Sequence, residues 1–368
     1  MGLLDHYRQF EAMTAEEVNA LKRDEATERR RAALERVPPL DLAQTTWPSP
    51  PHPAVVNAVT FAARRGLNRY PGAVSRELRS ELAHRHGWPE ERIAVGHGAA
   101  QLLGAAIHHL ISAGQELITP WPSYPLYPLL ARRAGGRAVP VADGDIDAIL
   151  AAVNDRTRVI ALAQPNDPTG ALLDVAALDR LVAALPDGIA VLLDEAPIEF
   201  AGAARERASV SLLDAHHRVL VFRSFSKAWG LAGLRCGYVV GAPGTEELLA
   251  ELAPDLGVHE LALVGALEAL RSASGDVRAR VRAIARERER LTRELRALGF
   301  DVPSSRANFL WVAHPRLGDG ALLDALGRAS ILVAPGAALG AGDRVRIAVR
   351  DRAASERLLR ALEGALGG

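Results

Sequence analysis

The chain of 368 residues carries 44 Lys plus Arg and 44 Asp plus Glu, and 49% of its residues are hydrophobic. This length exceeds that of a typical single core, so two packed domains are expected. The zero formal net charge argues against nucleic acid or a membrane surface as the main partner. The only cysteine, Cys236, excludes an internal disulfide and favours a cytoplasmic protein.

The N-terminal region is expected to form a helix followed by an extended arm. Residues 14–36 have a Glu/Arg-rich helical pattern, which Thr14 and Glu17 can start as a capping box. The proline-rich stretch 47–53 then predicts a stiff arm or crossover. The first residues lack the features of a signal peptide, and no apolar run is long enough to span a membrane. We assign residues 1–50 to this helix and arm.

From about residue 55, short apolar segments alternate with helical patterns. Strands are expected at 92–95, 116–119, 138–141, 159–163, 190–194, 219–224 and 237–240. Helical patterns at 100–111 and 175–185 lie between several of these strands. The alternation predicts an α/β fold with a mostly parallel sheet sandwiched by helices, in a large domain over residues 51–255.

The remaining residues, 256–368, predict a smaller α+β domain. A long helix is expected at about 276–298, strands at 308–312 and 345–349, and a final helix from Ala354. In open parallel sheets, ligands bind beyond the carboxyl ends of the strands. The chemically distinctive motifs of the chain fall at expected strand ends.

Lysine is almost absent, because only Lys22 and Lys227 occur among the 44 basic residues. A lysine retained where arginine serves elsewhere suggests chemistry that needs an amine, such as Schiff-base formation with an aldehyde. Lys227 lies in Ser-Phe-Ser-Lys-Ala-Trp-Gly-Leu-Ala-Gly-Leu-Arg, residues 224–235, directly after an expected strand. Ser224 and Arg235 offer a hydroxyl and a planar cation that suit a phosphate. A surface lysine in a glycine-rich loop is the alternative, which the length of the motif disfavours.

This lysine segment resembles the cofactor-binding segment of class I/II aminotransferases, most of all the histidinol-phosphate aminotransferase branch. The resemblance spans about residues 40–360 and implies the aspartate-aminotransferase-like fold, also called PLP fold type I. It implies pyridoxal 5'-phosphate as cofactor and Lys227 as the catalytic lysine that binds it. It also implies that Ser224, Ser226 and Arg235 contact the cofactor.

Further segments carry the same resemblance. The stretch 96–101, Gly-His-Gly-Ala-Ala-Gln, opens a helix after a strand, and its backbone at Gly98, Ala99 and Ala100 is the implied phosphate site. Tyr124 matches the tyrosine that stacks on the cofactor ring, although core packing explains it nearly as well. Asp194 ends a buried strand, where a carboxylate needs a partner, and the protonated pyridine nitrogen is the one implied.

The resemblance implies two more binding residues, one for the substrate carboxylate and one for the cofactor phosphate. Arg346, in Val-Arg-Ile-Ala-Val at 345–349, matches the arginine that binds the substrate carboxylate. Tyr70, in Asn-Arg-Tyr-Pro-Gly at 68–72, matches a tyrosine that reaches the phosphate of a neighbouring subunit. That second match implies a homodimer with shared active sites.

Several positions depart from the family pattern. Residues 164–170, Gln-Pro-Asn-Asp-Pro-Thr-Gly, match the turn that faces the cofactor's phenolic oxygen, but Asp167 replaces the asparagine before Pro-Thr-Gly. Pro197 replaces a tyrosine three residues after Asp194, and Asn166 could take over if the turn shifts. With these changes we expect the lysine–cofactor Schiff base to hold its proton into mildly alkaline pH.

Two further departures bear on the substrate. Ala334 replaces a phosphate-binding arginine of histidinol-phosphate enzymes, and residues 44–48 read Gln-Thr-Thr-Trp-Pro instead of the Asn-Glu-Asn-Pro stretch. The sequence therefore predicts an aminotransferase for an amino acid or related amine other than histidinol phosphate. Decarboxylation, oxidative deamination, elimination or cyclisation with the same cofactor is the alternative. A non-catalytic cofactor-binding protein is a third, and retention of Lys227 and Asp194 counts against it.

Overall fold

The computed structural model describes residues 14, 16–17, 19–20, 23–24, 27 and 38–367. Most of the helix expected at 14–36 lies outside the described residues. At its expected start, the backbone N–H of Thr14 donates to Glu17 Oε2 at 2.8 Å, and that of Glu17 donates to Thr14 Oγ1 at 3.3 Å. These two reciprocal hydrogen bonds are those of a capping box.

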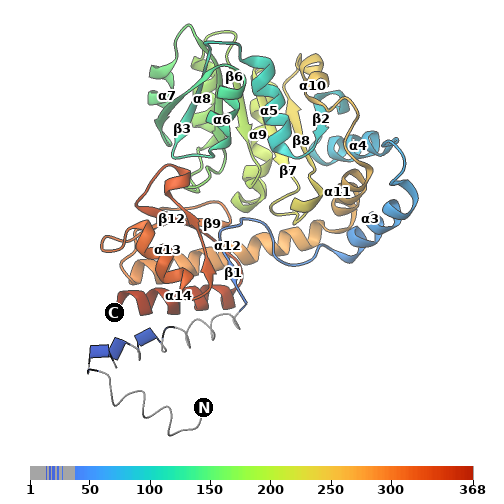
Figure 1. Ribbon diagram of the computed structural model, residues 1–368. Helices are drawn as coiled ribbons and strands as arrows, with labels where there is room; N and C mark the ends of the chain where they lie inside the picture. The colour runs from blue at the N-terminus through green and yellow to red at the C-terminus, as the bar shows by residue number, and fades with distance from the viewer. Residues whose placement is uncertain are drawn as a thin grey trace.

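A seven-stranded sheet forms the centre of the larger part of the molecule (Figure 1). Its strands, in spatial order, are β2 (Ile93–Gly96), β8 (Gly237–Gly241), β7 (Val219–Ser224), β6 (Ala190–Asp194), β5 (Thr157–Ala163), β3 (Glu116–Trp121) and β4 (Arg137–Ala142). Within this sheet only β8 runs against its neighbours. The prediction of a mostly parallel sheet is confirmed.

Both faces of this sheet are buried, because successive residues of a strand point to opposite faces. In β7, Leu220 and Phe222 join one apolar cluster, whereas Val219 and Val221 join the other. The first cluster includes residues of α5 (Ala99–Leu110), α6 (Leu126–Arg133) and α10 (Glu246–Leu252). The second includes residues of α3 (Pro53–Gly66), α4 (Val74–His86), α7 (Ile146–Ala152), α8 (Val175–Ala184), α9 (Ala203–Ala215) and α11 (Glu260–Ser272). The result is the three-layer α/β arrangement of Figure 1.

The C-terminal part is built on a smaller, antiparallel sheet of order β11-β12-β9. Its elements are α12 (Ser274–Ala297), β9 (Phe309–Ala313), α13 (Asp319–Gly327), β10 (Ile331–Leu332), β11 (Ala334–Pro335), β12 (Arg344–Ala348) and α14 (Arg352–Leu366). The N-terminal arm joins this part, since β1 (Leu40–Asp41) pairs in parallel with β10. Short 3-10 turns are η1 (Glu90–Arg92), η2 (Ile198–Ala201), η3 (Ala232–Leu234) and η4 (Ala337–Leu339).

The division into 1–50, 51–255 and 256–368 stays a prediction. Helix α11 follows the expected boundary, yet it packs against α3 and α4 of the larger part. The long helix α12 then runs from the larger part to the smaller one (Figure 1).

The start of α5 packs directly against β8 at Gly237. Gly237 pairs with Gly96 on one side and with Ser224 on the other. A Cβ at Gly237 would lie 2.5 Å from the backbone N of Ala99 and 2.8 Å from the carbonyl O of Arg223. The absence of a side chain therefore lets the helix start sit directly on the strand end.

We expect Gly237→Ala to destabilise the protein by about 1–3 kcal/mol, because the added methyl group overpacks this junction. Chemical denaturation at fixed cofactor concentration measures the change. Gly275→Ala in α12 is the matched control, since a Cβ there meets no atom within 4 Å. Equal stabilities of the two variants would contradict the close approach.

Candidate active site

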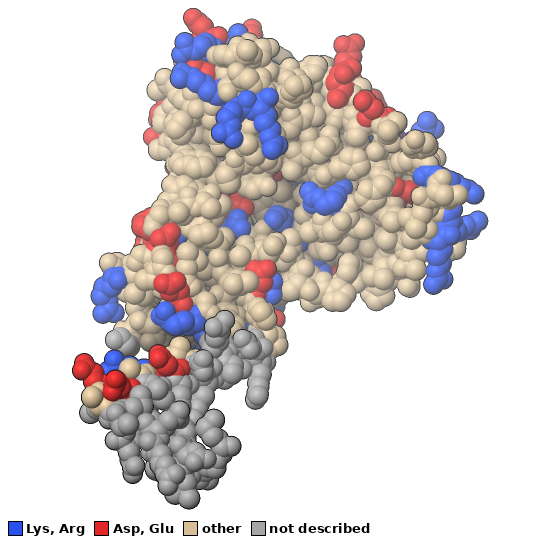
Figure 2. Space-filling view, in the orientation of Figure 1, with Lys and Arg blue, Asp and Glu red and all other residues tan. Residues whose placement is uncertain are grey.

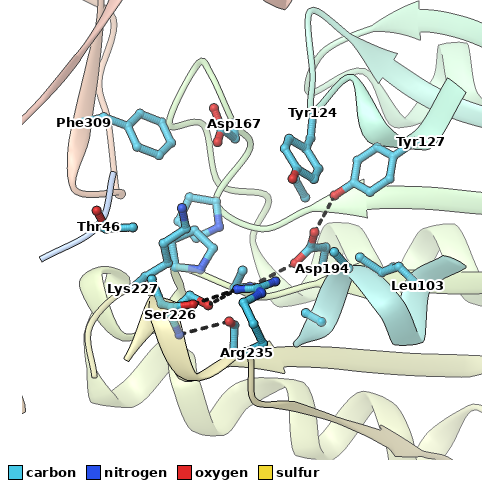
Figure 3. Close-up of a pocket in the computed structure, with 18 residues that line it drawn as sticks. Thr46, Leu103, Tyr124, Tyr127, Asp167, Asp194, Ser226, Lys227, Arg235 and Phe309 are labelled. Carbon is cyan, nitrogen blue, oxygen red and sulfur yellow. Dashed lines mark hydrogen bonds between the residues drawn. The ribbon is translucent and has the colours of Figure 1, made fainter. Parts of the chain in front are cut away.

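A cavity of about 190 Å³ lies beyond the carboxyl ends of β5, β6 and β7 (Figure 3). The sequence-predicted residues that line it are Ala99, Ala100, Tyr124, Asp167, Asp194, Ser224, Ser226, Lys227 and Arg235. The other lining residues are Thr46, Leu103, Tyr127, Ala163, Pro165, Ala196, Pro197, Ala232 and Phe309. Asp194 and Ser224 are the last residues of neighbouring parallel strands, so the sheet itself brings them to one edge.

The amine of Lys227 is held by the N-terminal arm. Its Nζ donates a hydrogen bond to Thr45 Oγ1 at 2.5 Å, and Thr46 lines the cavity beside it. Burial lowers the pKa of Lys227 below its ordinary value, whereas the nearby carboxylate of Asp167 acts to raise that pKa. A lowered pKa increases the neutral fraction of the amine, which is the nucleophilic form.

A cluster of buried polar side chains forms hydrogen bonds with residues in and next to the lysine segment. Arg223 Nη2 donates to Glu195 Oε2 at 2.9 Å, and Ser209 donates to the same carboxylate. Trp229, two residues after Lys227, donates from Nε1 to Glu199 Oε1 at 2.9 Å. The second oxygen of Glu199 is buried without a hydrogen-bond partner among the described residues. Burial, with the charge of Glu206, raises the pKa of Glu199 to about 8.

One end of the cavity has the features of an anion site. Gly98, with φ +83°, precedes α5, whose first amides have no acceptor within the helix. A Cβ at Gly98 would lie 2.8 Å from Arg235 Nη2, so the glycine lets the guanidinium approach the helix start. Arg235 Nη1 donates to Ser226 Oγ at 3.3 Å (Figure 3). Free amides, hydroxyls and a guanidinium at one place fit a phosphate group.

Asp194 faces the middle of the cavity as a buried carboxylate. Its Oδ2 accepts a hydrogen bond from Tyr127 Oη at 2.9 Å, and its Oδ1 accepts one from the backbone N of Ala196 at 3.1 Å (Figure 3). Burial raises the pKa of Asp194 to about 6. A buried carboxylate is stabilised by a cationic partner, so this site fits a protonated ring nitrogen. The ring of Tyr124 meets that of Tyr127 edge-on at 5.7 Å.

Arg346 is paired with Asp167 at the opposite end of the cavity. Arg346 Nη1 donates to Asp167 Oδ1 at 2.5 Å, and Nη2 donates to the carbonyl O of Ala43 at 2.9 Å. Its guanidinium lies over the ring of Phe309, 5.4 Å from the ring centroid. Asp167 and Phe309 line the cavity, whereas Arg346 is not among the residues that line it.

Besides Gly98 and Arg346, two further sequence-predicted residues, Asn166 and Tyr70, are not among those that line this cavity. The side chain of Asn166 accepts from Ser123 Oγ at 2.7 Å and donates to Asp143 Oδ2 at 2.9 Å, so its amide is already used. The Asn166 side chain is therefore not free to replace Asp167 in facing the cofactor. Tyr70 lies between α3 and α4 with 80% of its surface exposed. It is not among the residues that line the cavity, and its expected contact with the phosphate of a neighbouring subunit stays a prediction.

Sequence reasoning missed Thr45, Thr46, Tyr127 and Phe309. The two threonines stand within the stretch that departs from the family pattern, and that departure was the available signal. Tyr127 follows Tyr124 by three residues, a spacing that brings side chains to one side of a helical turn. Phe309 carried no signal, because only the pairing of β9 with β12 brings it beside Arg346.

The described residues contain no group of three or more His, Cys, Asp and Glu side chains that could hold a metal ion. In the same part of the chain, none of the helices combines the length and the apolar character needed to cross a membrane.

Glu199 gives the protein a testable pH dependence. Because its pKa is raised in the fold, the folded chain holds a proton that the unfolded chain releases. The resulting stability is fully present below the ordinary pKa of 4.5 and is lost as pH rises from there to about 8. We expect Glu199→Gln to flatten the fall in melting temperature over this range, since glutamine can still accept from Trp229. Thermal melts across pH measure this effect, with Glu251→Gln, at an exposed residue of α10, as the control. If the melting temperature of Glu199→Gln falls with pH as steeply as that of the wild type, Glu199 is not the group responsible for the loss of stability.

Comparison with known proteins agrees with this geometry. The family described as aminotransferase class I and II matches residues 38–362. An aromatic amino acid aminotransferase of Streptomyces coelicolor is 36% identical over 329 residues, covering 88% of this chain and 89% of that protein. One of Cutibacterium acnes is 39% identical over 280 residues, covering 74% of this chain and 78% of that protein.

Solved structures show the same fold. The crystal structure of histidinol-phosphate aminotransferase from Sinorhizobium meliloti, in complex with pyridoxal-5'-phosphate, superimposes with a TM-score of 0.81 at 27% identity. The match covers 92% of this chain and 94% of that one. Thermus thermophilus aspartate aminotransferase, as a tetra mutant, superimposes with a TM-score of 0.77 at 23% identity, covering 92% and 98%.

Proposed function

The chain belongs to the class I and II aminotransferases and is a pyridoxal-phosphate-dependent enzyme, and we propose that its substrate is an aromatic amino acid. The observation that carries the proposal is the cavity in which Lys227, Asp194 and Arg235 converge. Relatives named for aromatic amino acids, at 36% and 39% identity, support the choice of substrate. Decarboxylation and the other outcomes weighed from the sequence find no comparable support.

Each end of the cavity suits one part of the cofactor. The start of α5, from Gly98 to Ala100, would hold the phosphate together with Ser224, Ser226 and Arg235. Asp194 would hold positive charge on the ring nitrogen, and Tyr127 keeps that carboxylate in place through its hydrogen bond. Tyr124 would lie against the ring. When bound, pyridoxal phosphate supplies the electron sink that stabilises negative charge at the substrate Cα.

Lys227 would then move the proton at the substrate Cα. A buried amine with a lowered pKa accepts a proton more readily at neutral pH than an amine held permanently charged. Thr45 Oγ1 supports this role, because it accepts a hydrogen bond from Nζ and so fixes the direction of the amine.

The substrate end of the cavity suits an aromatic side chain better than a phosphorylated one. Phe309, which lies across the cavity from Asp194 in Figure 3, supplies apolar surface there. Arg346 would bind the α-carboxylate. Ala334, which stands opposite Arg346 in the β11–β12 pair, supplies no charge for a substrate phosphate. These features favour an aromatic amino acid over histidinol phosphate.

The proposed substrate class is tested with purified, cofactor-loaded protein and a panel of amino acids, with 2-oxoglutarate as acceptor. We expect L-phenylalanine or L-tyrosine to give the corresponding keto acid at the highest kcat/KM in the panel. Release of carbon dioxide or ammonia without keto-acid transfer would contradict transamination. A preference for small or acidic amino acids would contradict the aromatic substrate.

Covalent attachment of the cofactor is predicted at Lys227. Borohydride reduction of the loaded protein followed by peptide mapping should place the label on Lys227, because its amine faces the cavity. Lys22 is the internal control, being the only other lysine of the chain. A label on Lys22, or no label, would contradict the proposed site.

We further propose that the protein is a homodimer whose partner subunit contributes Tyr70. The face formed by α3 and the following loop exposes large apolar side chains, among them Phe61 (61% exposed), Leu67 and Tyr70. Contiguous exposed apolar surface is typical of a protein–protein interface.

Basic and acidic side chains share the face seen in Figure 2, which supports small molecules over nucleic acid as ligands. A cytoplasmic location is also proposed, and the buried free thiol of Cys236 supports it.

The dimer is tested by sedimentation of matched variants. Phe61→Asp should dissociate it, because the new charge would be buried in the interface. Leu332→Asp, at a residue that is 51% exposed in β10, should leave it intact. Tyr70→Phe should weaken cofactor retention without dissociation. A wild-type protein that sediments as an active monomer would refute the shared site.

A further inference from the structure

The arginine proposed to bind the substrate carboxylate already has two protein acceptors. Arg346 Nη1 donates to Asp167 Oδ1 at 2.5 Å, and Nη2 donates to the carbonyl O of Ala43 at 2.9 Å. Arg346 Nε is buried and has no acceptor among the described residues. Each terminal nitrogen of the guanidinium therefore has one of its two N–H groups engaged by the protein, so a carboxylate that binds both nitrogens meets acceptors already in place.

Asp167 is the member of this ion pair that lines the cavity. The Asp167 side chain is 17% exposed and that of Arg346 is 12% exposed, so water screens their ion pair only partly. Asp167 lines the cavity near Phe309, whereas Arg346 does not (Figure 3). At this end the cavity thus offers a carboxylate, which repels the negative group that an amino-acid substrate would place there.

The turn that carries Asp167 is held firmly in its place. Asn166 and Thr169, on either side of it, both donate to Asp143 Oδ2, at 2.9 and 2.7 Å. Asn166 also bonds Ser123, and the backbone N of Gly170 donates to the carbonyl O of Asn166 at 2.7 Å. The Asp167 backbone is therefore anchored, and only its side chain is free to leave Arg346.

We propose that Asp167 competes with the substrate for Arg346 and so weakens the binding of an α-carboxylate. A substrate carboxylate binds Arg346 only by displacing the Asp167 side chain, and it forfeits part of its interaction energy in doing so. A ligand of the same shape without a carboxylate meets no such competition. Asp167 is thus a specificity-determining residue that makes the enzyme depend on contacts with the substrate side chain. The inference rests on the proposed role of Arg346.

Equilibrium binding separates this effect from turnover. Isothermal titration of the cofactor-loaded protein with 3-phenylpropanoate measures binding of a carboxylate that lacks a reactive amine. Asp167→Asn keeps the shape and can still accept a hydrogen bond, but it removes the competing charge. We expect it to tighten 3-phenylpropanoate binding about tenfold. Binding of the neutral 3-phenylpropanamide should be unchanged, and a general change in cavity shape would alter both ligands.

Matched variants complete the test. Asp301→Asn removes a carboxylate from Arg344, two residues before Arg346 on the same strand, and should leave both affinities unchanged. Asp167→Ser is the second variant if Asp167→Asn folds poorly, and it too should tighten carboxylate binding. Arg346→Gln should weaken it.

The outcomes distinguish the two claims. If Asp167→Asn leaves 3-phenylpropanoate binding unchanged or weaker while Arg346→Gln weakens it, competition by Asp167 is wrong and the role of Arg346 stands. If neither variant alters binding, Arg346 does not bind the carboxylate, and both the proposed role and the inference fall. Equal gains for the acid and the amide would also overturn the inference.

Discussion

The buried amine of Lys227 is the feature on which the rest of the site depends. An amine in this position is costly unless its surroundings compensate, and here Thr45 Oγ1 accepts its hydrogen bond while Asp167 and Asp194 supply nearby negative charge. The three compensating groups come from the arm, the turn after β5 and the end of β6. The parallel sheet alone cannot bring them together, so closure of the cavity requires the N-terminal arm to lie across the strand ends.

The arm connects the two parts of the molecule at this point. It pairs with β10 through β1, accepts a hydrogen bond from Arg346 at Ala43, and accepts one from Asn308 Nδ2 at the carbonyl O of Thr45. A contact of substrate with Arg346 is thereby linked to the segment that holds Lys227. The Asp167–Arg346 pair belongs to the same connection.

Strands and motifs were predictable from the sequence because they are local. The apolar runs at 190–194 and 219–224 match β6 and β7 without a shift, and the lysine motif lies where strand ends were expected. Contacts between distant segments were not predictable. Asp167 was recognised as a departure, but its pairing with Arg346, 179 residues away, follows only from the packing of the smaller sheet against the cavity. The same holds for Phe309 and for Thr45.

The central claim is that Lys227 moves the proton at the substrate Cα, and its most direct test follows that proton. Cofactor-loaded protein is incubated with L-phenylalanine deuterated at Cα, without an amino acceptor, and the loss of deuterium to water is measured by mass spectrometry. The account predicts rapid loss in the wild type and loss slower by about a hundredfold or more in a cofactor-loaded Lys227→Ala variant. Equal rates in the two proteins, or no loss in the wild type, would contradict it.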